Sequence, residues 1–88
     1  MNGKVAVLIG SESDREIMES SCKYFDYFDI KMDLKVMSAH RNPKEVGQFA
    51  MSARKNKYDI LIGAAGMAAH LAGALKAYST LPVIGVPL

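Results

Sequence analysis

The sequence contains one cysteine, Cys22, among its 88 residues. A single cysteine excludes a disulfide within the chain, and the residues around it lack the spacing of metal ligands. A reducing compartment and a cytoplasmic location are therefore expected, and no metal site is predicted.

Blocks of one charge and long apolar runs are also missing. Eleven Lys and Arg and nine Asp and Glu are spread along the chain and give a formal net charge of +2. This balance does not indicate a nucleic-acid partner. The first apolar run stops at Gly10, far short of a membrane-spanning helix, and no small-residue cleavage site follows it. Neither a signal peptide nor a membrane partner is expected.

The composition indicates one small globular domain over residues 1–88. Half of the residues are hydrophobic and 23% are charged, which is typical of folded chains. A chain of this size buries only about 60 to 65% of its unfolded surface. Its stability is expected to be low unless another chain contributes.

Short apolar runs alternate with helical patterns. Apolar runs predict strands over 4–9, 32–37, 59–62 and 82–86, and apolar spacing predicts helices over 13–28, from 43 to about 53, and over 67–78. Charges at Asp33 and Lys35 indicate that the second strand lies at a sheet edge. We predict an α/β fold, a three-layer α/β/α sandwich with a parallel, flavodoxin-like sheet of four strands.

The last predicted strand is followed only by Pro87 and Leu88, without a helix to cover the sheet. Either other subunits cover this surface, or residues 1–88 are the N-terminal part of a longer domain. The intact protein is expected to be a homo-oligomer.

Three loops follow strands, at the edge of a parallel sheet where ligands bind. In the first loop, Gly10 permits close approach, Ser11 and Ser13 offer hydroxyls, and Asp14 is available to a ribose hydroxyl. A helix N-terminus there would present amides to a phosphate. A turn that only caps the helix is the alternative.

The second loop places Ser38, Ala39, His40 and Arg41 before an Asn-Pro helix start. Arg41 supplies a planar cationic donor for an anion. His40 can exchange a proton near neutral pH, because an ordinary imidazole titrates near pH 6.5. The alternative for His40 is a hydrogen-bonding surface residue.

The third loop, residues 63–70, consists mostly of glycine and alanine and ends at His70. A flat ring could lie against such a backbone, although the same residues suit helix-sheet packing and His70 could simply bond a neighbouring carbonyl. Together the loops predict a pocket for a small phosphorylated molecule, with His40 as the acid/base.

Four motifs resemble, in order and spacing, those of the bacterial-type N5-carboxyaminoimidazole ribonucleotide mutase family of purine biosynthesis. They are "GSESD" at 10–14, "SAHRNP" at 38–43, "AAHLAG" at 68–73 and "LPVIGVP" at 81–87. The third loop and the start of the helix after it depart from the family's usual pattern, because Ala64, Met67 and Ala72 stand in place of Gly, Gly and Pro.

The resemblance implies an isomerase that moves a carboxylate from the exocyclic nitrogen of an aminoimidazole ribonucleotide to a ring carbon, without metal or cofactor. It implies that His40 is the general acid and then base, that Ser11 and Arg41 hold the phosphate, and that Asp14 holds the ribose. It also implies a homo-octamer. The substrate-binding residues predicted in all are Gly10, Ser11, Ser13, Asp14, Ser38, Ala39, Arg41, Ala65, Gly66, His70 and Leu71.

Two other functions remain open at this level. One is the related carboxylase that adds free carbon dioxide to aminoimidazole ribonucleotide, although the Arg-Asn-Pro continuation at Arg41 is more similar to the mutase. The other is a nucleotide-binding α/β module without catalysis.

Overall fold

A computed structural model describes residues 3–39, 41–66 and 70–88 of the chain. Nine elements follow one another in these residues: β1 (Gly3–Ile9), the 3-10 helix η1 (Glu12–Asp14), α1 (Arg15–Glu19), α2 (Cys22–Tyr27), β2 (Ile30–Val36), α3 (Pro43–Ser52), β3 (Ile60–Ala65), α4 (His70–Tyr78) and β4 (Val83–Pro87).

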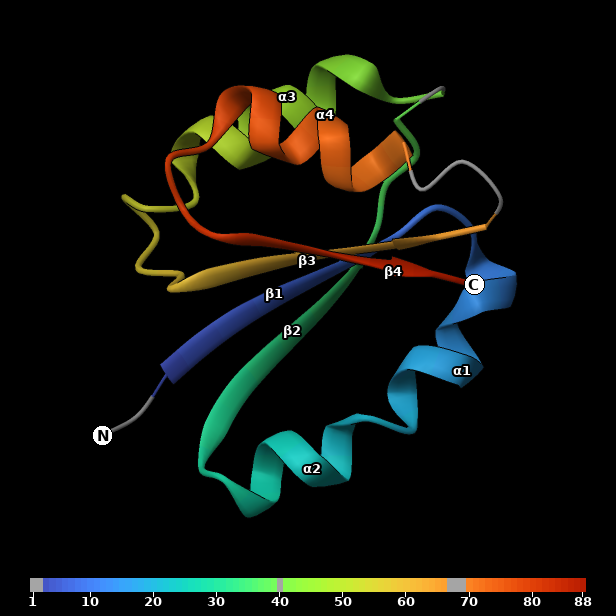
Figure 1. Ribbon diagram of the computed structural model, residues 1–88, viewed down its shortest axis with the longest axis vertical. Coiled ribbons are helices and arrows are strands. Elements are labelled where there is room, and N and C mark those ends of the chain that lie inside the picture. The colour runs from blue at the N-terminus through green and yellow to red at the C-terminus, as the bar shows by residue number, and fades with distance from the viewer. Residues whose placement is uncertain (1–2, 40, 67–69) are drawn as a thin grey trace.

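The four strands form one parallel sheet in the order β2-β1-β3-β4. Helices α3 and α4 lie on one face and α1 and α2 on the other (Figure 1). The chain runs from β1 outward to β2 and then crosses back to β3, so right-handed crossovers place the helices on opposite faces. The predicted three-layer fold and the edge position of the second strand are confirmed.

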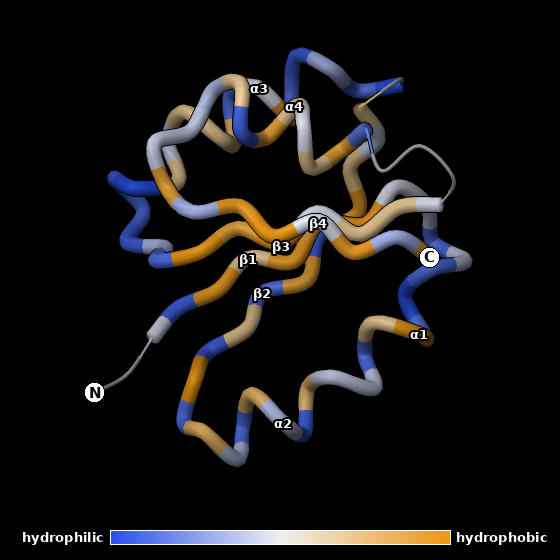
Figure 2. The backbone as a smooth tube through the Cα atoms, in the orientation of Figure 1, coloured by the Kyte–Doolittle hydropathy of each residue, from blue (hydrophilic) through white to orange (hydrophobic). Residues whose placement is uncertain are grey.

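Each face of the sheet has its own apolar core, and the strands form the hydrophobic centre of Figure 2. Leu8, Leu61 and Leu75 lie in the cluster beneath α3 and α4. Val7 and Ile9 point the other way and pack with Met18 of α1. This alternation along β1 explains why its residues 5–9 are all buried.

The helix predicted over 13–28 is interrupted, which corrects the sequence interpretation. The hydroxyls of Ser20 and Ser21 donate to the carbonyls of Ile17 and Met18, both over 2.6 Å. Such bonds compete with helical backbone pairing, and α1 ends before Ser20. Ser13 and Glu16 have the spacing that predicts a helix capping box, but α1 begins at Arg15 without a side-chain cap.

The third strand is longer than predicted. Gly63 and Ala64 were expected in a turn, but they pair with Leu8 and Ile9 of β1 and are buried. Small side chains are compatible with this strand because α4 packs closely over it.

None of the helices in the described ranges is long and apolar enough to cross a membrane.

A buried tyrosine ties the edge strand to the chain entering β3. Tyr58 is 6% exposed and donates its hydroxyl to the carboxylate of Asp33 over 2.7 Å. Burial, and then this hydrogen bond, raises the pKa of Tyr58 to about 12. The fold therefore favours the neutral phenol.

We expect Tyr58→Phe to lower the free energy of unfolding by about 1 to 2 kcal/mol at neutral pH, because a hydrogen bond to a carboxylate is lost. Below the unfolded pKa near 10 the contribution is fully present, and it disappears as the pH rises towards 12. Denaturant titrations at several pH values should show that this fall is smaller in Tyr58→Phe than in wild type. Tyr24→Phe, at an exposed tyrosine, is the control, and equal behaviour of the two variants would contradict the assignment.

Candidate functional site

A cavity of about 340 Å³ lies where β1, β2 and β3 end. This is the switch point of the sheet, because the chain leaves β1 and β3 on opposite faces. The described residues that line it come from all three predicted loops: Gly10, Ser11, Asp14, Ser38, Ala39, Ala65, Gly66, His70 and Leu71.

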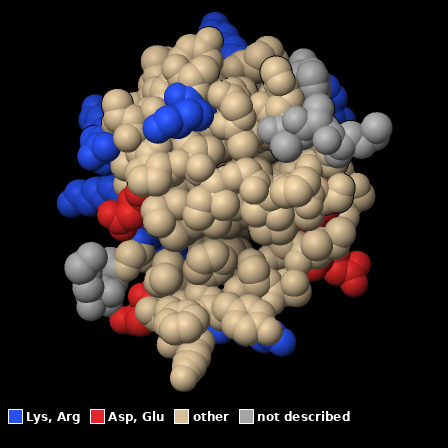
Figure 3. Space-filling model, viewed as in Figure 1, with Lys and Arg blue, Asp and Glu red and all other residues tan. Residues whose placement is uncertain are grey.

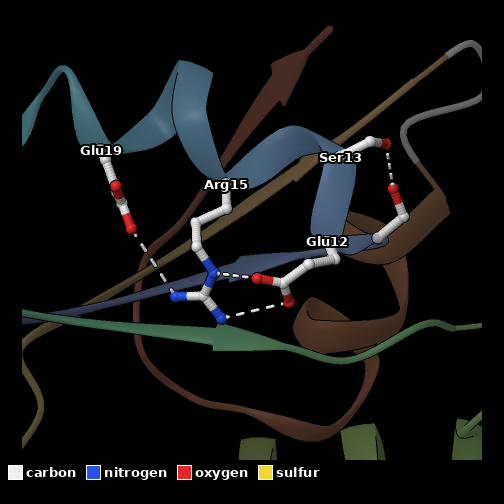
Figure 4. Close-up of polar contacts among 5 residues, drawn as sticks. Glu12, Ser13, Arg15 and Glu19 are labelled. Atoms are coloured by element: carbon white, nitrogen blue, oxygen red, sulfur yellow. Dashed lines mark hydrogen bonds and ion pairs between the residues drawn. The ribbon is translucent and has the colours of Figure 1, made fainter.

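The first loop brings two hydroxyls together. Ser11 Oγ and Ser13 Oγ are 2.6 Å apart (Figure 4), and the amide of Asp14 donates to the carbonyl of Ser11 over 3.1 Å. Ser11 and Asp14 line the cavity, whereas Ser13, a predicted site residue, does not line it and bonds to Ser11. The wall therefore offers hydroxyl donors next to a carboxylate.

An ion pair between Arg15 and Glu12 lies in the same segment, outside the cavity lining. Arg15 donates to the carboxylate of Glu12 through two guanidinium nitrogens and lies 3.8 Å from Glu19 (Figure 4). The hydrogen bond from Arg15 lowers the pKa of Glu12, and the same bond raises the pKa of Arg15. Both side chains lie at the surface, so the pair contributes little to stability.

The second loop closes on itself before α3. The hydroxyl of Ser38, which is 9% exposed, accepts from the amide of Arg41 over 3.1 Å. The amide of Asn42 donates to the carbonyl of Ser38 over 2.7 Å, while Asn42 Oδ1 accepts from the Ser38 amide over 3.4 Å. These bonds hold Ser38 and Ala39 in the cavity wall.

Arg41 joins the first two loops. Its Nη2 donates to the carbonyl of Gly10 over 3.0 Å, across 31 positions of sequence. Arg41 does not line the cavity but lies beside Gly10, which does. A guanidinium has further N–H groups in a fixed plane, so this contact leaves donors for an anion.

The third loop and the first residues of α4 supply the remaining lining residues. Ala65 and Gly66 continue from the end of β3, and His70 and Leu71 begin α4. Leu71 is buried while His70 is exposed. Residues 67–69, part of the predicted third loop, lie outside the described residues, as does the predicted catalytic residue His40.

The residues lining the cavity thus bring two serine hydroxyls, one carboxylate, one imidazole and several small or apolar side chains, and a guanidinium lies adjacent to them. The cavity falls within the usual size of a small-molecule site. In the described part of the chain, no group of three His, Cys, Asp or Glu side chains is arranged to hold a metal ion.

Two features of the site were not foreseen from the sequence. Asn42 was expected only as a helix cap, yet it makes no cap bond and instead accepts from Ser38. The bond from Arg41 to Gly10 was also unexpected. An Asn-Pro step and a glycine carry no sequence signal for these contacts.

Comparison with known proteins gives consistent matches. Residues 4–88 match the family model described as AIR carboxylase. The N5-carboxyaminoimidazole ribonucleotide mutases of Pyrococcus abyssi and Escherichia coli K12 are each 40% identical over 85 residues, covering 97% of this chain and 49% and 50% of theirs. That of Bacillus subtilis is 42% identical over all 88 residues, which cover 54% of its length.

The solved structures agree on the fold. The crystal structure of Treponema denticola PurE superposes with a TM-score of 0.88 at 22% identity, covering 100% of this chain and 56% of that one. The chain therefore spans about half the length of the relatives that it matches.

Proposed function

The chain belongs to the AIR carboxylase family, and we propose that the protein is a mutase that converts N5-carboxyaminoimidazole ribonucleotide to 4-carboxy-5-aminoimidazole ribonucleotide in purine biosynthesis. The observation that carries this proposal is the cavity, which gathers the three loops containing the motifs of that mutase family. The names of the relatives support the same reaction.

The proposed reaction exchanges one bond to carbon dioxide for another. The bond between the exocyclic nitrogen and the carboxylate carbon breaks, carbon dioxide is released in the site, and His40 gives a proton to that nitrogen. The ring carbon then attacks carbon dioxide, and the proton on that carbon returns to His40. The residue ends in its starting state, so no external acid or base is consumed.

The phosphorylated end of the substrate is assigned to the first two loops. Ser11 and Arg41 are proposed to bind the phosphate, and their support is the bond that joins Arg41 to Gly10 beside Ser11. Asp14, in the same wall, is proposed to accept from the ribose. Ser13, Ser38 and Ala39 complete this side of the site.

The imidazole and the carbon dioxide are assigned to the third loop. Ala65 and Gly66 present little side chain to the cavity, and Leu71 adds an apolar wall beside His70. An apolar surface suits uncharged carbon dioxide, since it holds less water that would compete for it.

The proposal is tested by measuring the turnover of each substrate separately with purified full-length protein. Turnover of N5-carboxyaminoimidazole ribonucleotide supports the mutase. Turnover of aminoimidazole ribonucleotide with bicarbonate alone would replace it with the carboxylase. Calorimetric binding of the ribonucleotide without any turnover would favour a non-catalytic module.

The cytoplasm is the proposed location. The support is Cys22, a free cysteine in a chain that has no second one for a disulfide.

A homo-oligomer, and by the family resemblance an octamer, is the proposed assembly. Ile84 of β4 pairs in register with Ile62, which faces α1, and yet Ile84 is 49% exposed. The centre of the face in Figure 3, where β4 lies in Figure 1, carries no charged side chains. Apolar surface of this kind is typical of an interface.

The isolated 88-residue chain is expected to self-associate or to be poorly stable, because the apolar surface of β4 stays exposed unless another chain packs on it. It is also expected to show little activity. Sedimentation at micromolar concentration, together with a thermal melt, measures both properties. A well-folded monomer with a cooperative melt would show that this sheet needs no further cover.

A further inference from the structure

Two glycines of neighbouring strands lie directly beneath one residue of α4. Gly63 of β3 and Gly85 of β4 are register partners. A Cβ atom on Gly63 would lie 2.9 Å from both Cα and N of Ala72, and one on Gly85 would lie 3.2 Å from Cβ of Ala72. The helix therefore rests on the sheet with no room for a side chain at Gly63 and very little at Gly85.

This contact lies close to the cavity along both chains. Ala72 immediately follows His70 and Leu71, which begin α4 and line the cavity. On the strand side, Ala65 and Gly66 follow Gly63 by two and three residues and line the same wall. A change in the height of α4 over the sheet would therefore move His70 and Leu71 relative to Ala65 and Gly66 and change the shape of the cavity.

We propose that Gly63, Gly85 and Ala72 are positioning residues that set the shape of the substrate cavity, by fixing how closely the start of α4 approaches β3 and β4. They do not line the cavity and act through His70 and Leu71. The kinetic part of this inference rests on the proposed function, whereas the packing part does not.

The two glycines differ in what opposes them, and this difference gives the test. Gly85 is opposed by a side-chain atom, Cβ of Ala72, which Ala72→Gly removes. Gly63 is opposed mainly by the backbone of Ala72, which no substitution at position 72 removes. Adding Ala72→Gly should therefore restore the original position of α4 in the Gly85→Ala variant but not in the Gly63→Ala variant.

The experiment uses the full-length protein with each glycine replaced by alanine, alone and combined with Ala72→Gly, and Ala72→Gly alone as the baseline. Because a misplacement of ~1 Å can cost about 10²-fold in rate, a shift of a few tenths of an ångström in Gly85→Ala should lower kcat/KM about threefold to tenfold. Adding Ala72→Gly should bring kcat/KM back to within about twofold of the baseline, and the loss in Gly63→Ala should be larger and persist. Gly73→Ala, on the same helix with nothing within 4 Å of its added Cβ, should leave kcat/KM unchanged.

A second measurement follows the packing without any turnover. The imidazole resonances of His70, assigned by comparison with His70→Gln, should shift in Gly85→Ala and return on addition of Ala72→Gly. If wild type turns over neither substrate, the proposed function fails while these resonances still test the packing.

Unchanged kinetics and unchanged His70 resonances in Gly85→Ala would overturn the inference. So would a loss in Gly85→Ala that Ala72→Gly leaves uncorrected. If Gly63→Ala does not fold, the comparison of Gly85→Ala with and without Ala72→Gly decides by itself. That substitution is the better tolerated, because its added Cβ lies 3.2 Å from Ala72 rather than 2.9 Å.

Discussion

Turnover in a His40→Asn variant is expected to fall by about 10²- to 10⁴-fold, which is the usual contribution of a positioned acid/base group. Asparagine can still donate a hydrogen bond but cannot accept and return a proton near neutral pH. Substrate affinity should therefore weaken by less than about tenfold, so that the loss falls on kcat. Steady-state kinetics and calorimetry on full-length protein separate the two quantities.

The thermal melt of His40→Asn provides the control, since a variant that melts like wild type has lost chemistry rather than its fold. Turnover within threefold of wild type would remove His40 from its proposed role. A large loss of affinity at unchanged kcat would assign His40 to binding instead.

Arg41 is expected to act mainly on binding. Arg41→Ala removes both the proposed phosphate contact and the bond to Gly10, so KM should rise about 10- to 10²-fold, in keeping with a charge-assisted hydrogen bond. Arg41→Lys keeps the charge but loses the planar fork. Its KM should lie between those of wild type and Arg41→Ala.

Arg54→Lys is the matched control for this substitution. Arg54 bonds Thr80 over 2.9 Å and does not line the cavity, so its replacement should leave KM unchanged. An unchanged KM in both Arg41 variants would mean that the phosphate binds elsewhere.

The candidate site was predictable to the extent that it depends on where loops follow strands. The carboxyl ends of parallel strands meet at one edge of the sheet. The predicted strands alone therefore place Ser11, Ser38 and Ala65, which follow or end three of them, close together. The structure gathers all three around one cavity. It does not describe His40 or residues 67–69, and their roles stay predictions.

Other contacts, in the site and in the fold around it, join residues that are far apart in the sequence, and no local pattern predicts them. The bond from Arg41 to Gly10 spans 31 positions, and that from Tyr58 to Asp33 spans 25. Each requires two segments to be packed before their side chains can meet. An arginine or a tyrosine in a sequence does not by itself indicate which residue it will bond.

The sequence by itself determined the alternation of strands and helices and the three-layer fold, because apolar periodicity is local and the short crossovers have a preferred hand. Only the tertiary structure decided that β3 continues through Gly63 to Ala65. The break of the first predicted helix at Ser20 and Ser21 comes instead from local bonds, to carbonyls three residues earlier, that the sequence pattern did not reveal. Glycine and alanine suit a turn as well as a strand, and serine suits a helix surface as well as a break. The choice for Gly63 is made by the approach of Ala72 from α4, a contact between chain segments that exists only after the sheet and helix have packed.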